Sequence, residues 1–225
     1  AIAATVDVIL SRSITGNSIG AKLTIPQGTL FTDSSGNSWL SARDVTWYSN
    51  VTTCKVPIIQ HEKYTASVLN NMVIPTGDRV IIHLGTLPNG KYYEQGSMSL
   101  QIGGETWVLV DTFAKSKPTD KHFMVSVDEA LNPYIMFGDG TFGKKPAAGA
   151  KITNVVFYLT NGTQGNVKSN TITSVPSVIS SSITDATVSN AYDAGGGSNY
   201  ENFTMLKEHI PLSVKTLGVA ITKED

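Results

Sequence analysis

The amino-acid sequence predicts a mainly β protein (α+β overall), with an antiparallel β-sandwich or barrel-like body and a short C-terminal helical region. Short runs rich in Val, Ile, Thr and aromatic residues follow one another from Ala1 to about Val175. The turns between them contain Asn-Gly, Gly-Gly or Asn-Pro pairs, which supply the backbone angles that a chain reversal requires. The one clear helix signal, a capping box at Ser198 and Glu201, comes near the end.

Alternation and bounding turns justify the predicted strands one after another. In TVDVIL, Val6, Val8 and Leu10 share one face, which is the pattern of a half-buried strand. In GAKLTIPQGTLF, Pro26 must lie at an end or an edge, because it cannot donate to a ladder. EKYTASVLNNMV fits a short helix or a strand pair equally well. The remaining strand segments are the end of DSSGNSWL, then RVIIHL, SMSLQI, TWVLVDTF, FMVSV, YIMF and ITNVVFYLT.

Changes in composition divide the chain into four expected regions. These are an N-terminal β region at 1–60, a central β domain with the FGDG segment at 61–175, a Ser/Thr/Gly-rich arm at 176–198, and a helical segment at 199–225. In the last region Phe203, Leu206 and Ile210 recur at helical spacing until Pro211 ends the pattern. Both ends look cut, so we expect the chain to be a fragment of a longer protein.

The composition narrows the class of function. Apolar residues make up 40% of the chain and charged residues only 16%, against a usual charged share of about 25%. Such a surface suits packing against other proteins, and it is equally expected of an ordinary β-rich domain. The net charge of −1 indicates no nucleic-acid partner, and no apolar run reaches the ~20 residues that span a bilayer. Cys54 is alone, so an internal disulfide is excluded.

No pattern typical of catalysis or ligand binding is present, so we expect no enzyme, metal, cofactor or small-molecule ligand. The four histidines are widely spaced, and neither a GxSxG elbow nor a phosphate loop occurs. Asp139 in FGDGTFG lacks the further oxygen ligands at alternate positions that a calcium loop needs. The glycines of GGGSNYE precede a helix start, but Ser198 already caps that end, so a hinge is the simpler interpretation.

The stretch YIMFGDGTFGKKPAAG is expected to be a structural hairpin. YIMF forms a strand, GDG a tight turn whose glycines have positive φ, and TFG begins the returning strand. Phe137 and Phe142 flank the turn and are placed to pack against each other. KKPAAG then forms a second turn, with Lys144 and Lys145 at a solvated corner.

Residues 135–167 resemble the hallmark of the baseplate J-like family. Its members are baseplate wedge proteins of contractile-tailed bacteriophages, including the T-even type, and of related injection machines. The family pattern is a strand, FGDG, a Pro-x-x-Gly turn, a strand ending in Tyr, and a Gly-x-x-Gly-Asn segment. Residues 23–40 and 191–225 resemble further family segments in the same order. The matching positions are Phe137, Gly138, Asp139, Gly140, Gly143, Pro146, Gly149, Tyr158, Gly162, Gly165 and Asn166, with Gly195 and Gly196 downstream.

The resemblance implies a non-enzymatic structural protein of the virion. Such proteins link the wedges of the tail baseplate, often as homodimers, and follow sheath contraction by rigid-body rearrangement. The implied partners are a second copy of the chain and other baseplate proteins, in a particle assembled in the host bacterial cytoplasm. The motif residues would act by shaping turns, and residues 45–102 match nothing in the family pattern.

A tail-associated carbohydrate-binding module, or adhesin, is the alternative to a structural role, and a glycan or peptidoglycan hydrolase is a more distant one. In an adhesin, exposed aromatic side chains would stack on a host glycan, whereas in a purely structural protein they would pack across strands. The candidates for such stacking are Trp39, Trp47, Tyr48, Tyr92 and Tyr93.

Overall fold

The protein is mainly β, as the sequence predicts, and its sheets curl as half-barrels with one short helix late in the chain. The computed structural model describes residues 1–13, 22–65 and 71–200. Among these residues no helix is long and apolar enough to cross a membrane. The predicted capping-box helix, with Phe203, Leu206 and Ile210, lies outside the described residues.

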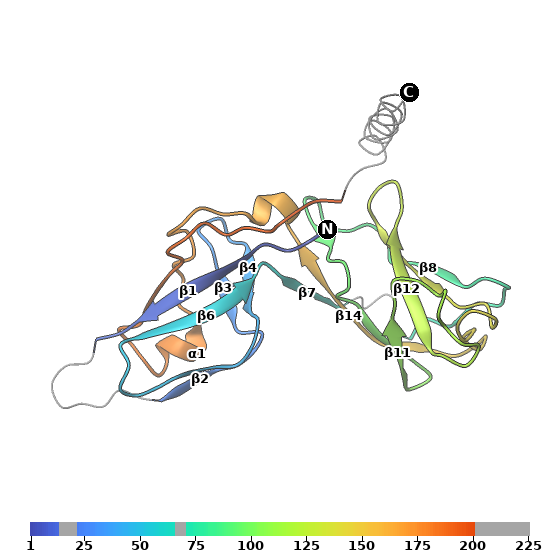
Figure 1. Ribbon diagram of the computed structural model, residues 1–225, viewed down its shortest axis with the longest axis horizontal. Coiled ribbons are helices and arrows are strands. Elements are labelled where there is room, and N and C mark those ends of the chain that lie inside the picture. Colours follow the sequence, from blue (N-terminus) through green and yellow to red (C-terminus); the bar gives the residue numbers. More distant parts are fainter. Residues whose placement is uncertain (14–21, 66–70, 201–225) are drawn as a thin grey trace, which may run out of the picture.

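Two units, each with its own hydrophobic core, lie one after the other along the long axis of the molecule (Figure 1). The inserted unit contains the described residues between 61 and 160. The discontinuous unit contains the described residues of 1–60 and 161–198. The chain therefore passes into the inserted unit after Gln60 and returns to the discontinuous unit at Asn161.

A five-stranded antiparallel sheet forms the frame of the discontinuous unit. Its order is β15 (Thr187–Ser189), β1 (Thr5–Ser11), β6 (Thr53–Ile59), β4 (Ser38–Ser41) and β3 (Leu30–Thr32). Beside it, β2 (Leu23–Ile25) pairs with β5 (Val45–Trp47), and the short helix α1 (Ser177–Ser180) buries Ile179 in the same core. The predicted alternation of the first strand is present, since Val8 and Leu10 are fully buried.

The segment 176–198, expected to be an arm, is part of the discontinuous unit. Its strand β15 takes an edge position and pairs antiparallel with β1. Farther along, Thr5 and Gly195 exchange backbone hydrogen bonds of 2.8 and 3.1 Å, and Ile2 and Ser198 exchange bonds of 2.9 and 3.0 Å. The strand that pairs with this segment, β1, therefore belongs to the same chain.

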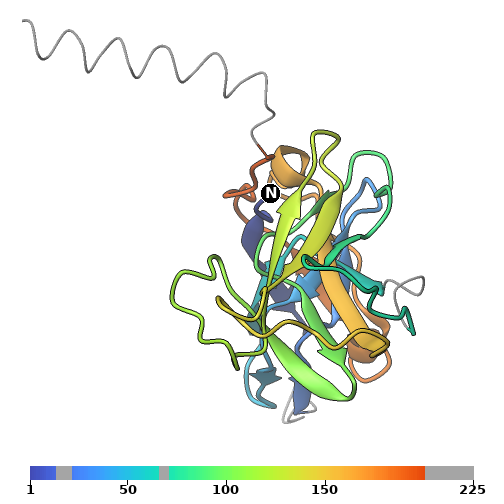
Figure 2. The same ribbon diagram turned by 90° about the vertical axis from the view of Figure 1, so that its right-hand side faces the viewer.

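A curled eight-stranded sheet forms the inserted unit (Figure 2). Its order is β7 (Glu62–Thr65), β14 (Ile152–Thr160), β10 (Ser99–Ile102), β11 (Glu105–Leu109), β12 (His122–Val127), β13 (Pro133–Phe137) and β8 (Ile81–His83), with β9 (Tyr92–Tyr93) also paired to β14. The pairs are antiparallel except β11 with β12, which is parallel. Strand β7 occupies the start of the segment 62–73, which the sequence left open between helix and strand.

The segment that follows β13 is not the predicted hairpin. β13 pairs with β12 and β8, whereas β14, the next strand in the chain, pairs with β7, β9 and β10. The returning strand begins at Ile152 instead of directly after the FGDG turn. Both edges of β13 are already occupied, because Ile135 lies between Val125 and Ile82. The chain must therefore cross to the other side of the curled sheet before it can pair again.

Candidate functional site

The residues that match the family pattern gather at two places in the structure. One group surrounds the turn after β13, in the inserted unit, and comprises Phe137, Gly138, Asp139, Gly140, Gly143, Pro146 and Gly149. The second group lies at and beside the chain crossings between the two units and comprises Tyr158, Gly162, Gly165, Asn166, Gly195 and Gly196. We call these places the FGDG turn and the junction.

The FGDG turn is closed by the side chain of Asp139. Its Oδ1 accepts hydrogen bonds from the backbone N–H of Thr141, at 2.8 Å, and of Phe142, at 2.9 Å. These bonds to the charged form hold the pKa of the Asp139 carboxyl below its usual value. Gly140 N–H donates to the carbonyl of Gly143 at 3.0 Å, and both glycines have positive φ, +95° and +84°. The aspartate thus shapes the turn.

The first glycine of the turn, Gly138, is needed because two backbone segments approach closely there. A Cβ on Gly138 would lie 2.4 Å from the carbonyl carbon of Gly143, a distance that real Cβ atoms essentially never show. A Cβ on Gly143 would in turn lie 3.3 Å from the Phe113 ring. Farther on, Gly149 has a φ of +84° and donates its N–H to the Ile74 carbonyl at 3.0 Å. The 138–149 segment is therefore held through its backbone, by the contact of Gly138 with Gly143 and by the bond of Gly149 to Ile74.

An apolar cup of about 220 Å³ opens beside the turn. Met124, Met136 and Ile81 are cross-strand neighbours on β12, β13 and β8, and they share the face of the sheet that is turned away from the core. Phe113 and Phe142 also line the cup, and Phe142 is 54% exposed. This part of the sheet therefore presents apolar side chains on both of its faces.

The two phenylalanine side chains that flank the turn, Phe137 and Phe142, lie in different surroundings. Phe137 lies in the core, where its ring meets Trp107 edge-on at a centroid distance of 5.4 Å. Backbone contacts, and not a pair of phenylalanine rings, therefore hold the turn. The expected solvated corner forms long surface ion pairs. Lys144 Nζ lies 4.0 Å from Glu105, and Lys145 Nζ lies 3.8 Å from Asp78.

A buried glutamine binds the two chain crossings at the junction. Gln60 is fully buried, and its Oε1 accepts hydrogen bonds from Thr160 Oγ1 at 2.9 Å and from Asn161 N–H at 2.6 Å. Its own backbone N–H donates to the Ala4 carbonyl at 2.9 Å. The side chain of Gln60 therefore joins the outgoing and returning chains to each other, and its backbone joins them to the start of the chain.

A second set of polar groups, buried or half-buried, extends this contact into the discontinuous unit. Asn161 Nδ2 donates to Asn37 Oδ1 at 2.6 Å, and Asn37 Nδ2 donates to Asp33 Oδ2 at 2.9 Å. Asp33 also accepts from Trp39 Nε1 at 3.2 Å. Burial alone would raise the pKa of the Asp33 carboxyl, but its hydrogen bonds outweigh burial and lower the pKa. The carboxylate therefore stays ionised inside the protein.

Glycines let the backbones at the junction touch. A Cβ on Gly197 would lie 2.4 Å from the Gly162 carbonyl oxygen, and a Cβ on Gly165 would lie 3.1 Å from Gln60 Oε1. Asn166 fixes the same place, because its amide donates to the Gly197 carbonyl at 2.9 Å and accepts from the Gly197 N–H at 2.8 Å. The Gly-Gly segment, which was expected to act as a hinge, is therefore held directly after Gly196, where both backbone groups of Gly197 bond to Asn166.

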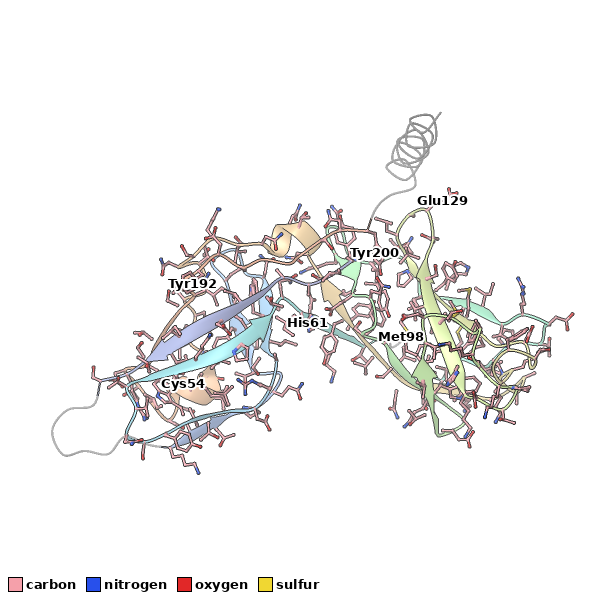
Figure 3. The ribbon with its side chains drawn as sticks, viewed as in Figure 1. Cys54, His61, Met98, Glu129, Tyr192 and Tyr200 are labelled. Carbon is pink, nitrogen blue, oxygen red and sulfur yellow. The ribbon has the colours of Figure 1, made fainter. Side chains whose placement is uncertain are left out.

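An imidazole lies between the units (Figure 3). His61 pairs with Glu94, and its ring stacks on Tyr158 at a centroid distance of 4.7 Å. These two rings, together with residues of β4 and the loop before β3, line a cleft of about 520 Å³. Nearby, burial raises the pKa of Tyr93 to about 12 and also raises that of Tyr200. His61 thus has both an acidic and an aromatic partner.

Most of the aromatic residues considered for glycan stacking are inside the protein. Trp39, Trp47 and Tyr93 are at most 1% exposed, so their ring faces are covered. Tyr48 is 59% exposed and Tyr92 is half-buried. Within the described ranges, no group of three or more His, Cys, Asp or Glu side chains could hold a metal ion.

Sequence reasoning assigned no role at the junction to four residues that help to build it, namely Asp33, Gln60, Asn161 and Gly197. A lone glutamine between two apolar strands gives no periodic signal, and its role depends on partners about 100 positions away. The Asp33–Asn37 spacing is typical of a turn and gives no sign of a contact with Asn161.

Comparisons with known proteins give a weak structural similarity. No family model matches the chain, and no curated protein matches it. Among solved structures, a chain of "Cryo-EM structure of the anti-feeding prophage (AFP) baseplate, 6-fold symmetrised" is similar with a TM-score of 0.28 and 13% sequence identity. The match covers 94% of this chain and 38% of that chain, so this chain spans well under half of its length. A TM-score this low does not establish a shared fold.

Proposed function

We propose that the protein is a structural, non-enzymatic component of a contractile phage-tail baseplate. In this role it is a wedge protein that links neighbouring subunits by homodimerisation and moves as a rigid body when the sheath contracts. Its partners are a second copy of the chain and other baseplate proteins, and its place is the tail of the virion.

The observation that supports this most is how the family-pattern glycines are used. Gly138 lies against the backbone of Gly143, and the Gly-x-x-Gly-Asn segment lies against Gly197 through Gly162 and Asn166. At these places the chain needs the absence of a side chain. Glycines that are used for close backbone packing fit a structural protein better than a catalytic one.

The junction supports movement as one body. Two units with separate cores can swing about their connections unless specific contacts hold them. Here Gln60 joins both crossings, and Asn161 connects them to Asn37. A force applied to one unit would therefore be transmitted to the other through buried hydrogen bonds, as a linking protein requires.

Electron microscopy of intact contractile particles tests the proposal, with an antibody raised against this chain as the label. The expected result is label at the baseplate rim that redistributes when the sheath contracts. Label confined to the tips of tail fibres would overturn the proposal in favour of the adhesin.

A further inference from the structure

Strand β8 is an edge of the eight-stranded sheet whose orientation can be derived from its bonds. In an antiparallel ladder, alternate residues direct both backbone groups at the partner strand. Phe137 N–H donates to the Val80 carbonyl at 3.3 Å, and Leu84 N–H donates to the Pro133 carbonyl at 3.0 Å. Val80, Ile82 and Leu84 therefore face β13 with their N–H and C=O groups.

The residues between them, Ile81 and His83, direct their N–H and C=O groups away from β13. None of the described residues bonds these four groups. By contrast, the outer side of the β3 edge in the other sheet is engaged, because Thr32 forms a bridge with Ser174 and Ser34 N–H donates to a carbonyl at 2.8 Å. β8 also lacks the proline, lysine or bulge that commonly protects an exposed edge.

An apolar surface adjoins this open edge. The Ile81 side chain is 46% exposed, and it continues the row of Met136 and Met124 that lines the cup. β8 lies at the end of the molecule opposite the five-stranded sheet (Figure 1). A partner strand can therefore approach β8 without meeting the discontinuous unit.

We propose that β8 is the self-association edge of this protein: two copies pair their β8 strands antiparallel about a two-fold axis and join their sheets into one. The inference rests on the homodimer of the proposed function and names the surface that forms it. A two-fold axis uses the same surface on both copies, so one open edge is sufficient.

A register centred on Ile82 satisfies all four of these backbone groups. It places Ile81 opposite His83 of the second copy, so that each such pair exchanges two backbone hydrogen bonds. The same register places Arg79 opposite Gly85 of the second copy, and Asp78 opposite Thr86 of the second copy. No two like charges face each other across the axis, which is the arrangement that a stable strand pair requires.

Sedimentation of the purified chain over a range of concentrations tests the proposal through matched variants. Ile81→Lys places a charge in the apolar row, and His83→Pro removes an outward N–H while leaving the bonds of Ile82 to β13 in place, as a proline on an edge strand can. Each is expected to raise the dimer Kd at least about tenfold. Val178→Lys, at an exposed aliphatic residue of the other unit, is expected to leave the Kd unchanged.

A disulfide test checks the register. The double variant Ile81→Cys with His83→Cys places two cysteines opposite each other across the axis, where Cα atoms of a bonded strand pair are about 5.5 Å apart, within disulfide range. Mild oxidation is expected to give a covalent dimer of this variant, and none of Val178→Cys. The native Cys54 is buried and does not compete.

The outcomes separate this inference from the proposed function. A dimer whose Kd is unchanged in Ile81→Lys and His83→Pro, both confirmed as folded by circular dichroism, would overturn the β8 surface and leave the homodimer standing. A wild-type chain that stays monomeric at all concentrations would overturn self-association through β8. Antibody labelling of the baseplate rim is independent of both results.

Discussion

Gly138 lies so close to Gly143 that a Cβ at Gly138 would be 2.4 Å from both the carbonyl carbon and the carbonyl oxygen of Gly143. The obstacle is backbone, which cannot rotate away as a long side chain can. Gly138→Ala is therefore expected to lower the free energy of unfolding by about 3 kcal/mol, at the upper end of the cost of overpacking. Urea denaturation followed by tryptophan fluorescence measures this change.

Gly77→Ala is the matched control, because Gly77 lies in the same unit, has no positive φ, and would bring its Cβ no closer than 3.5 Å to another atom. It is expected to change stability by less than about 0.5 kcal/mol, like an ordinary surface substitution. Equal losses in the two variants would show that the approach of Gly138 to Gly143 is not what limits this turn.

The sequence predicted the type of structure better than the connections within it. Strands at TVDVIL and YIMF follow from alternation and β-branched residues, which are local properties. The prediction of a hairpin at FGDG was wrong. Both edges of β13 are occupied by the strands of Val125 and Ile82, and this pairing cannot be deduced from the local sequence. The family-pattern residues follow one another in the sequence, but their division between the turn and the junction depends on long-range packing.

Replacing Gln60 by methionine keeps the length of the side chain and removes its hydrogen-bonding groups. Thr160 Oγ1 and Asn161 N–H would then be buried without their acceptor, at a cost of about 1–3 kcal/mol for each unsatisfied group. Gln60→Met is expected to destabilise the protein, and limited proteolysis is expected to cut near residues 60 and 161. Gln164→Met, on the exposed side of the returning crossing, is the control. Similar proteolysis of both variants would argue against Gln60 as the residue that holds the two chain crossings together.

Asp33 makes the stability of the discontinuous unit depend on pH. Its pKa in the folded protein lies below the usual 3.8, so the carboxylate contributes stability that is fully present above 3.8 and is lost as the pH falls through the lowered pKa. Thermal unfolding of the wild type and of Asp33→Asn, measured from neutral pH downward, is expected to differ most at neutral pH. The difference should shrink below about pH 4.

Asp111→Asn serves as the control for this pH profile, because Asp111 is an exposed carboxylate. Its profile is expected to follow that of the wild type throughout. A constant difference between wild type and Asp33→Asn down to the lowest pH would contradict a role for the ionised form of Asp33.

Cys54 is expected to react slowly with thiol reagents in the folded protein. Burial raises the pKa of its thiol, and this effect outweighs the Arg12 guanidinium, which lowers it. Since the thiolate is the reactive form, both the low thiolate fraction and the 8% exposure should slow labelling, by about a hundredfold or more relative to an exposed thiol. Thr53→Cys adds a thiol one residue earlier on the exposed face of β6, so this variant should show one fast and one slow reaction with a chromogenic disulfide. Two fast reactions in the folded variant would mean that β6 opens far more readily than its buried face and its pairing with β1 indicate.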